Sequence, residues 1–140
     1  MVSFSYSFVL FLVHGRDFGL LFFRAVFGVI MMVHGFPKLK NLKETSLNFA
    51  NMGFRPGAFW GTLAALLESL GGIALTFGFM AIPLAGLFVL EFLTIVIWKI
   101  SKHMPFAGGW EFDLLLCSAP LMLFLFGAGM TSLDHVLFWL

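Results

Sequence analysis

Three charged side chains stand inside stretches of sequence that are otherwise apolar, and they are the first residues to consider for chemistry. Arg24, Glu68 and Glu91 each lie within a run long and apolar enough to cross a bilayer. A charge at the centre of a spanning helix costs about 2.5–3.5 kcal/mol on insertion scales, so it persists where it is paired or faces a polar cavity. These side chains are candidates for a site that binds a polar head group or carries protons.

Each of the three also has a purely structural interpretation. Arg24 and Glu68 carry opposite charges on different predicted spans, and the simplest hypothesis is an ion pair between helices. Such a pair can fix the register of two helices without any chemistry. Glu91, in the middle of the third span, is interpreted either as a proton carrier or as a neutral, protonated acid, because burial disfavours the ionised form of a carboxyl group.

A second group of polar side chains lies where the spans should meet the membrane surface. His34 stands four residues before Lys38, so the imidazole and the ammonium are side by side if the helix continues past Pro37. Together they would bind an anionic or carbonyl oxygen, or relay a proton. Alternatively, Lys38 extends to lipid head groups and His34 bonds a neighbouring helix. His103 and Glu111 should face the same surface, so a cluster with Lys38 is compatible with the predicted spans.

The composition defines the elements that must position these residues. The chain has 140 residues, of which 61% are hydrophobic and 11% charged, whereas about 25% of the residues of a soluble domain are charged. Its mean hydropathy is +1.03. We therefore predict an all-α integral membrane protein with a single domain over 1–140. The net charge of +1 and the lack of a basic run give no reason to expect nucleic acid as a partner.

Hydropathy and turn residues predict a four-helix bundle. Gly35 and Pro37 are expected to end or kink the first span. The short, uncharged connection at 79–83 predicts that the second and third spans are antiparallel neighbours. The predicted spans are 18–36, 58–79, 82–100 and 110–127.

Short interfacial helices are expected beside this bundle. Phe4–Val13 is too short to span a membrane at about 1.5 Å per residue. Part of the polar loop after the first span has interleaved leucines that favour an amphipathic helix on the membrane surface. The tail Leu133–Leu140 is interpreted as an interfacial anchor. Membrane lipid is therefore an expected partner at both surfaces.

Small residues mark the faces where helices should pack closely. On the second span, Gly61, Ala65, Glu68 and Gly72 recur at spacings of four, three and four, which places them on one helical face. Small residues allow a neighbouring helix to approach closely in a membrane. Glu68 is therefore expected to point into a seam between helices. The residues assigned to helix packing are Gly28, Gly61, Ala65, Gly71 and Gly72.

The distribution of basic residues predicts the orientation in the membrane. Short cytoplasmic loops carry an excess of lysine and arginine. The loops after the first and third spans should therefore be cytoplasmic, with both termini outside. These two loops hold Lys38, Lys40, Lys43, Arg55, Lys99 and Lys102, against Arg16 alone on the other side.

The residues that are missing exclude several chemistries. Cys117 is the only cysteine, so a disulfide, a C-x-x-C pair and an iron–sulfur cluster cannot form within one chain. The same count excludes a thiol mechanism like that of the four-helical vitamin K epoxide reductases. Histidines and carboxylates do not occur at metal-ligand spacing, so no metal site is predicted.

Five motifs occur in an order and spacing that resemble the DoxX family of small membrane proteins, over about 19–134. The resemblance implies a four-helix membrane bundle related to the DoxD subunit of thiosulfate:quinone oxidoreductases, in a bacterial or archaeal cytoplasmic membrane. By position, the polar signature of the family falls on Arg24, His34, Lys38, Glu68, His103 and Glu111. The motifs are Arg24 with Gly28, His34-Gly35 with Lys38-Leu39, Glu68 with Gly71-Gly72, Gly109 with Glu111, and Gly127-Ala128-Gly129 with Ser132-Leu133-Asp134.

The chain departs from the family pattern at three places. The basic residue that is common after the second span is replaced by the apolar stretch 79–82. Met130 stands where an arginine usually precedes Ser-Leu-Asp, so Asp134 is expected to have lost its partner. Glu91 falls where the pattern is usually apolar, so we expect it to be particular to this protein or to its partner.

Three classes of function follow. The favoured one is a subunit of a quinone-linked membrane oxidoreductase, in which the bundle admits a quinone and the polar residues hold its head group and move protons. No redox centre is visible in the chain, so electrons would arrive from another membrane subunit. The second is a structural or accessory subunit of a respiratory or photosynthetic complex that binds lipid. The third, a transporter centred on Glu68 and Glu91, is disfavoured by the lack of an inverted repeat.

Overall fold

The structure is a computed structural model that describes the backbone of residues 2–138 and the side chains of residues 15–137. These residues form helices and connecting turns, without a strand. The element η1 is a single turn with π-helical hydrogen bonding. The element η2 is a kinked turn, because Ala107 and Gly108 have non-helical backbone angles. In chain order the elements are α1 (Val2–Lys40), α2 (Leu42–Met52), α3 (Gly57–Leu66), η1 (Leu67–Gly71), α4 (Gly72–Phe77), α5 (Ala81–Ser101), η2 (Phe106–Trp110), α6 (Glu111–Phe126) and α7 (Leu133–Phe138).

The described residues contain four helical stretches that are long and apolar enough to cross a membrane. The first lies in α1, the second is the continuous run of α3, η1 and α4, the third is α5, and the fourth joins η2 to α6. This confirms the prediction of an all-helical membrane bundle. The spans are Gly15–Lys40, Gly57–Phe77, Ala81–Ser101 and Phe106–Phe126.

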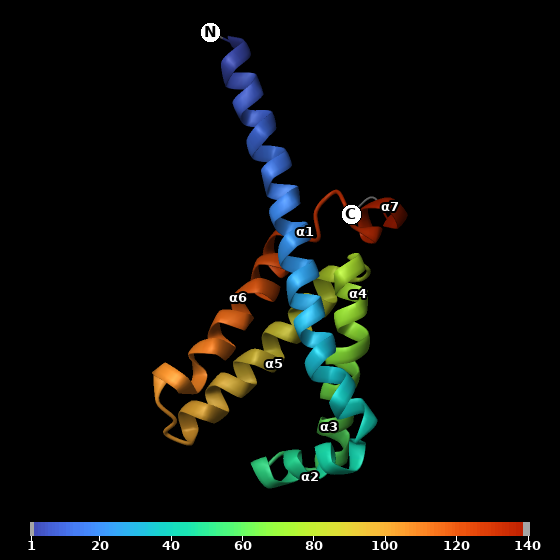
Figure 1. The fold of residues 1–140 in the computed structure, drawn as a ribbon, viewed down its shortest axis with the longest axis vertical. Helices are drawn as coiled ribbons and strands as arrows, with labels where there is room; N and C mark the ends of the chain where they lie inside the picture. The colour runs from blue at the N-terminus through green and yellow to red at the C-terminus, as the bar shows by residue number, and fades with distance from the viewer. Residues whose placement is uncertain (1, 139–140) are drawn as a thin grey trace.

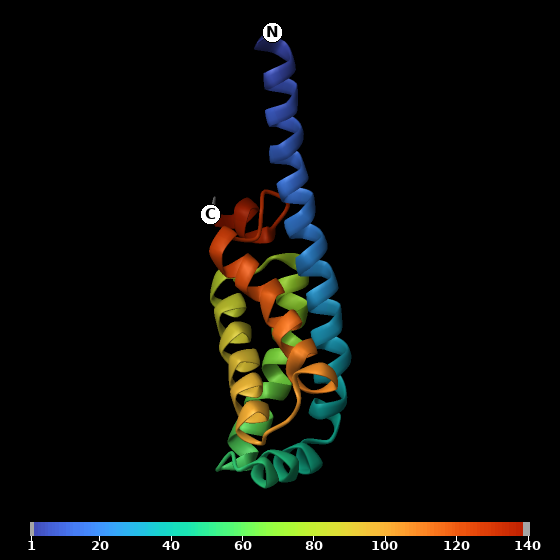
Figure 2. The ribbon, with the colours of Figure 1, turned by 90° about the vertical axis from the view of Figure 1, so that its left-hand side faces the viewer.

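Helix α1 is continuous from Val2 to Lys40, so two predictions about it were wrong. Phe4–Val13 is not a separate helix, because α1 continues through Gly15. A single glycine costs only about 1 kcal/mol in a helix and does not end one. Of the two outcomes expected at Gly35 and Pro37, an end or a kink, the end of the span is wrong, because the helix tolerates the missing N–H of Pro37. The Pro37 carbonyl still accepts the N–H of Asn41 at 3.1 Å. The first turns of α1 project beyond the other helices (Figures 1 and 2).

The four spans form two pairs that diverge toward one end. Helix α1 packs along the second span, and α5 packs along α6. Figure 1 shows α5 and α6 slanting away from α1 and α3 toward the end where α2 lies. The second and third spans are antiparallel, but they meet mainly near their connecting turn, where the ring of Phe88 lies 3.4 Å from the position of a Cβ on Gly71. The prediction that they are neighbours therefore holds at one end only.

Glycines on α1 explain why the second span packs against α1. A Cβ on Gly28 would lie 2.6 Å from the carbonyl oxygen of Gly72, and one on Gly35 would lie 2.4 Å from the backbone nitrogen of Ser69. Both distances are shorter than van der Waals contact, so the two backbones touch where α1 has no side chain. Gly61 instead faces α2.

Aromatic packing joins the two pairs at the other end. Phe27 of α1 makes edge contacts with Phe88 and Phe92 of α5, with ring centroids 5.1 and 5.9 Å apart. Edge-to-face geometry is favourable because the positive edge of one ring meets the negative face of the other. Leu75 and Leu123 are completely buried in the same core. The bundle is thus closed near the turn between α4 and α5.

Helix α2 is the short helix that we predicted in the first loop, and it crosses the open end of the bundle (Figure 2). Asn41 caps its N-terminus by accepting the N–H of Glu44, and Gly53 ends it in the left-handed conformation at φ 100°. Its last carbonyl, that of Met52, accepts the indole N–H of Trp98 at 2.9 Å. This hydrogen bond ties the end of α2 to α5.

The C-terminal segment contains the predicted short helix as α7. Ser132 caps it, because its Oγ accepts the N–H of His135 at 3.1 Å. Trp139 and Leu140, which belong to the predicted anchor, lie outside the described residues. The turn between α4 and α5 and helix α7 lie at one end of the bundle, and the two loops rich in lysine lie at the other (Figure 1). Which end faces the cytoplasm stays a prediction.

Candidate functional site

A cavity of about 600 Å³ lies between the second span and α5, at the end where the two helix pairs diverge. Helix α2 forms part of its wall. Most of the lining is apolar and aromatic, including Phe49, Phe54, Trp60 and Trp98. The charged groups in the lining come from all four spans. They are Lys38, Glu68, Glu91, Lys99 and Asp113.

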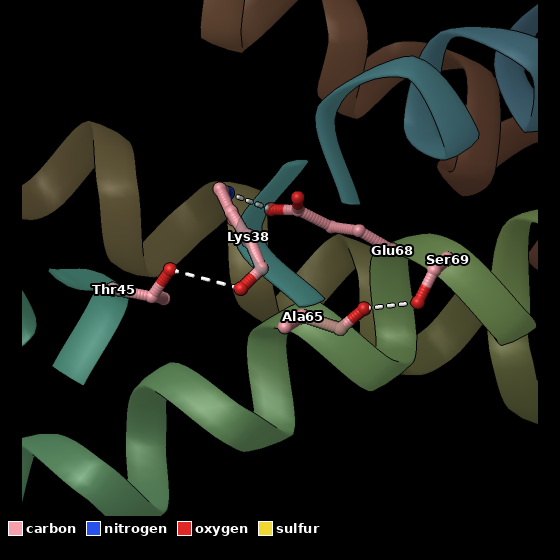
Figure 3. A network of polar contacts seen from close by, with 5 residues as sticks. All are labelled: Lys38, Thr45, Ala65, Glu68 and Ser69. Carbon is pink, nitrogen blue, oxygen red and sulfur yellow. Dashed lines mark hydrogen bonds and ion pairs between the residues drawn. The ribbon is translucent and has the colours of Figure 1, made fainter. Parts of the chain in front are cut away.

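An ion pair between Lys38 and Glu68 forms the charged centre of this cavity (Figure 3). The Lys38 Nζ donates to Glu68 Oε1. The Thr45 hydroxyl donates to the Lys38 carbonyl at 3.1 Å, so α2 helps to hold this turn of α1. Glu68 is only 5% exposed, and it lies in the π-turn η1. Single π-turns recur at functional sites, where they adjust the direction of a side chain.

The predicted ion pair between Arg24 and Glu68 was wrong. Arg24 and Lys38 are 14 residues apart on α1, which corresponds to about 21 Å along a helix. The second span runs antiparallel to α1, so Glu68 lies beside Lys38 and Arg24 lies beside the end of α4.

Arg24 forms a clamp at the closed end of the bundle instead. It is 2% exposed, and it donates to the carbonyl oxygens of Ala128 at 2.7 Å, Thr131 at 2.8 Å and Thr76 at 3.2 Å. These bonds hold the segment before α7 against the end of α4. Arg24 is therefore a structural residue far from the cavity.

Asp134 completes the clamp, so the expectation that it lacks a partner was wrong. Its carboxylate accepts the N–H groups of Met80 and Ala81, each at 2.7 Å. These are among the free N–H groups at the start of α5, where a carboxylate is favoured by the helix dipole. Asp134 also interacts electrostatically with Arg24. Backbone N–H groups and Arg24 are therefore the partners of Asp134.

Glu91 belongs to the same charged centre as Lys38 and Glu68. Its carboxyl group interacts with both of them, and the cavity is lined by all three. One oxygen of Glu68 and one of Glu91 are buried without a hydrogen-bond donor among the described residues. Glu68 stands twelve residues before Met80 and Glu91 eleven after it. In an antiparallel hairpin of two helices, residues at similar distances from the turn lie at similar depths in the membrane. This spacing predicts from the sequence that Glu68 and Glu91 lie close together.

A second ion pair lies at the margin of the cavity and was missed in the sequence. Lys99 of α5 pairs with Asp113 of α6 at 2.6 Å and also donates to the carbonyl of Gly109 at 3.1 Å. In the sequence, Lys99 was explained by membrane topology alone. The structure adds that each neutralises the other.

Three candidates from the sequence lie away from the cavity. His34 is exposed on α1, and His103 is exposed in the turn after α5. Glu111 is exposed, and its carboxylate accepts the N–H of Gly108 at 2.9 Å, within its own turn. The suggested cluster with Lys38 does not form, because Lys38 turns inward to Glu68.

The fold and the site together define a small integral membrane protein with four spans and a charged cavity between diverging helix pairs. The chain belongs to the DoxX family, whose model matches residues 19–103. It is similar to "Putative oxidoreductase CatD" of Bacillus subtilis (strain 168), with 30% identity over 122 residues, which cover 87% of this chain and 89% of that protein. No solved structure matches the chain significantly. The matched family region includes Lys38, Glu68 and Glu91.

Proposed function

We propose that this protein is the quinone-binding subunit of a membrane oxidoreductase assembly. The observation that carries the proposal is the cavity of about 600 Å³ with the Lys38–Glu68 pair in its wall. Ligand cavities of about 300–1,000 Å³ with mostly apolar walls and a few polar groups are typical of small-molecule sites. The name of the relative CatD points to the same class of reaction.

The chemistry of the lining suits a quinone. Lys38 supplies a cationic donor for a carbonyl oxygen of the head group. Trp60 and Trp98 supply flat aromatic surface for the ring. Leu63 and Leu90 line the cavity and are also 47% and 62% exposed, so they offer an apolar exit for an isoprenoid tail.

Binding is testable through the tryptophans of the cavity. A quinone without a long tail should quench their fluorescence saturably in the purified protein. Lys38→Ala should weaken the affinity about tenfold or more, because a hydrogen bond to a charged group contributes about 1.5–3 kcal/mol. His34→Ala is the matched control on the same helix, and it should leave the affinity unchanged because His34 is exposed outside the cavity. Equal affinity in the Lys38 variant and wild type would contradict the assignment.

In this proposal, the electrons reach the quinone from a partner subunit. Cys117, the only cysteine, is buried and forms no redox pair within the chain. Gentle purification from the native membrane, followed by mass spectrometry of proteins and lipids, should recover a redox enzyme together with bound quinone. Recovery inside a large complex without quinone would instead favour the structural-subunit hypothesis.

A further inference from the structure

The cavity contains more acidic groups than cations to neutralise them. Its lining has two cations, Lys38 and Lys99, and three carboxyl groups, Glu68, Glu91 and Asp113. Lys99 lies 2.6 Å from Asp113, and Lys38 is bonded to Glu68. Glu91 is therefore the carboxyl group that has no cation of its own.

Geometry decides the state of that third group. Glu91 lines the same cavity as Glu68 and interacts with it electrostatically, and Glu68, which is 5% exposed, is already paired with Lys38. Two neighbouring carboxylates in a poorly solvated site cannot both stay ionised with one cation between them. A proton on Glu91 removes the excess charge, and it also gives a donor to the buried carboxyl oxygens that lack one.

We propose that Glu91 is a protonated acid that donates its hydrogen bond to Glu68 in the empty cavity and to a carbonyl oxygen of the bound head group in the occupied one. Glu91 is then a specificity-determining residue that favours an occupant with a carbonyl acceptor. The identity of this occupant as a quinone rests on the proposed function, whereas the protonated state of Glu91 does not.

Infrared spectroscopy of the full chain in lipid nanodiscs tests the protonation directly. At pH 7 an ordinary glutamate is ionised, so the carbonyl stretch of a protonated carboxyl group should come from Glu91. Glu91→Gln, which keeps the size of the side chain, should abolish this band. Glu111→Gln is the matched control and should leave the band unchanged, because Glu111 is exposed outside the cavity. A band that is missing in wild type, or that persists in Glu91→Gln, would overturn the proposal.

A second variant tests the charge count even if Glu91→Gln fails to fold. Lys38→Met removes the cation that pairs with Glu68, so the charge count predicts that the two glutamates together bind a second proton. The intensity of the band should then rise about twofold relative to wild type. An unchanged band in Lys38→Met would show that Lys38 does not set the state of the pair, and the proposal would fail.

Adding menadione, a quinone without an isoprenoid tail, separates this proposal from the proposed function. If both are right, menadione shifts the Glu91 band because the hydrogen bond changes its acceptor. If the band is present but menadione does not perturb it, Glu91 is protonated and the assignment of the cavity to quinone fails. If menadione quenches the tryptophans while no band is present, the quinone site stands and the proposed role of Glu91 fails.

Discussion

Replacing Arg24 by methionine should lower the free energy of unfolding by about 3–5 kcal/mol, the range for breaking a buried charged network. The substitution removes the donor for the carbonyl oxygens of Thr76, Ala128 and Thr131. Each buried acceptor left without a donor costs about 1–3 kcal/mol. It also removes a positive charge beside Asp134, which is 8% exposed. The segment that precedes α7 should separate from the end of α4.

The single cysteine provides the measurement for this variant. Cys117 is buried in the core, so its reaction with a thiol dye during heating in detergent reports unfolding. Arg16→Met is the matched control, because Arg16 lies on the same helix and donates one hydrogen bond, to the carbonyl of Phe126, in an exposed position. We expect Arg16→Met to unfold near the wild-type temperature. If the two variants unfold at the same temperature, Arg24 is not a clamp.

Gly35→Ala should strongly disrupt the packing of α1 against the second span. The new methyl group would lie 2.4 Å from the nitrogen of Ser69 and 2.7 Å from the carbonyl carbon of Glu68. These are backbone atoms that cannot rotate away, so α1 and η1 must separate. Overpacking of this kind costs about 1–3 kcal/mol or more. Since Lys38 lies on the next turn of α1, the Lys38–Glu68 pair should be lost as well, and quinone affinity should fall with stability.

The same chemical change at Gly19 provides the control. Gly19 lies on the same helix, and no atom comes within 4 Å of the position of its Cβ. Gly19→Ala should therefore be neutral or stabilising by up to about 1 kcal/mol, because alanine is the better helix former. The unfolding temperature monitored at Cys117 should fall in Gly35→Ala and should stay equal to wild type or rise in Gly19→Ala. A loss of similar size in both would show that helix packing at Gly35 is not the cause.

The four-helix bundle was predictable from the sequence because its signals, apolar runs and turn residues, are local and strong. Runs of apolar residues about 20 long define spans, and Gly53 and Pro56 separate the first loop from the second span. Pro37 was misleading, since a proline near the end of a helix removes a single hydrogen bond that the helix tolerates. Glycines predicted close packing but not their partners. Gly61 faces α2, and Gly35 faces the π-turn η1, for which the sequence carries no recognised signal.

The site was predicted in part, and the errors have one origin. Opposite charge suggested Arg24 as the partner of Glu68, although antiparallel spans place residues together only at equal depth. Arg24 and Asp134 form hydrogen bonds with backbone carbonyl and N–H groups. Because every residue except proline carries both groups, the sequence cannot indicate which residues are the hydrogen-bond partners. Lys38 and Glu68 were named as candidates, but not as partners. Glu91 was predicted as a proton carrier or a neutral acid, but its place in the same cavity as Lys38 was not predicted.

Photocrosslinking with a quinone that carries a photoreactive group tests the central claim most directly. If the quinone site is the cavity between the second span and α5, the labelled peptides should contain Trp60 and Trp98, and unlabelled quinone should compete. A smaller hollow of about 150 Å³, between α1 and α6 and lined by Val26 and Leu115, provides the alternative location. Labelling confined to that hollow, or spread over the outer faces of the helices without competition, would contradict the account.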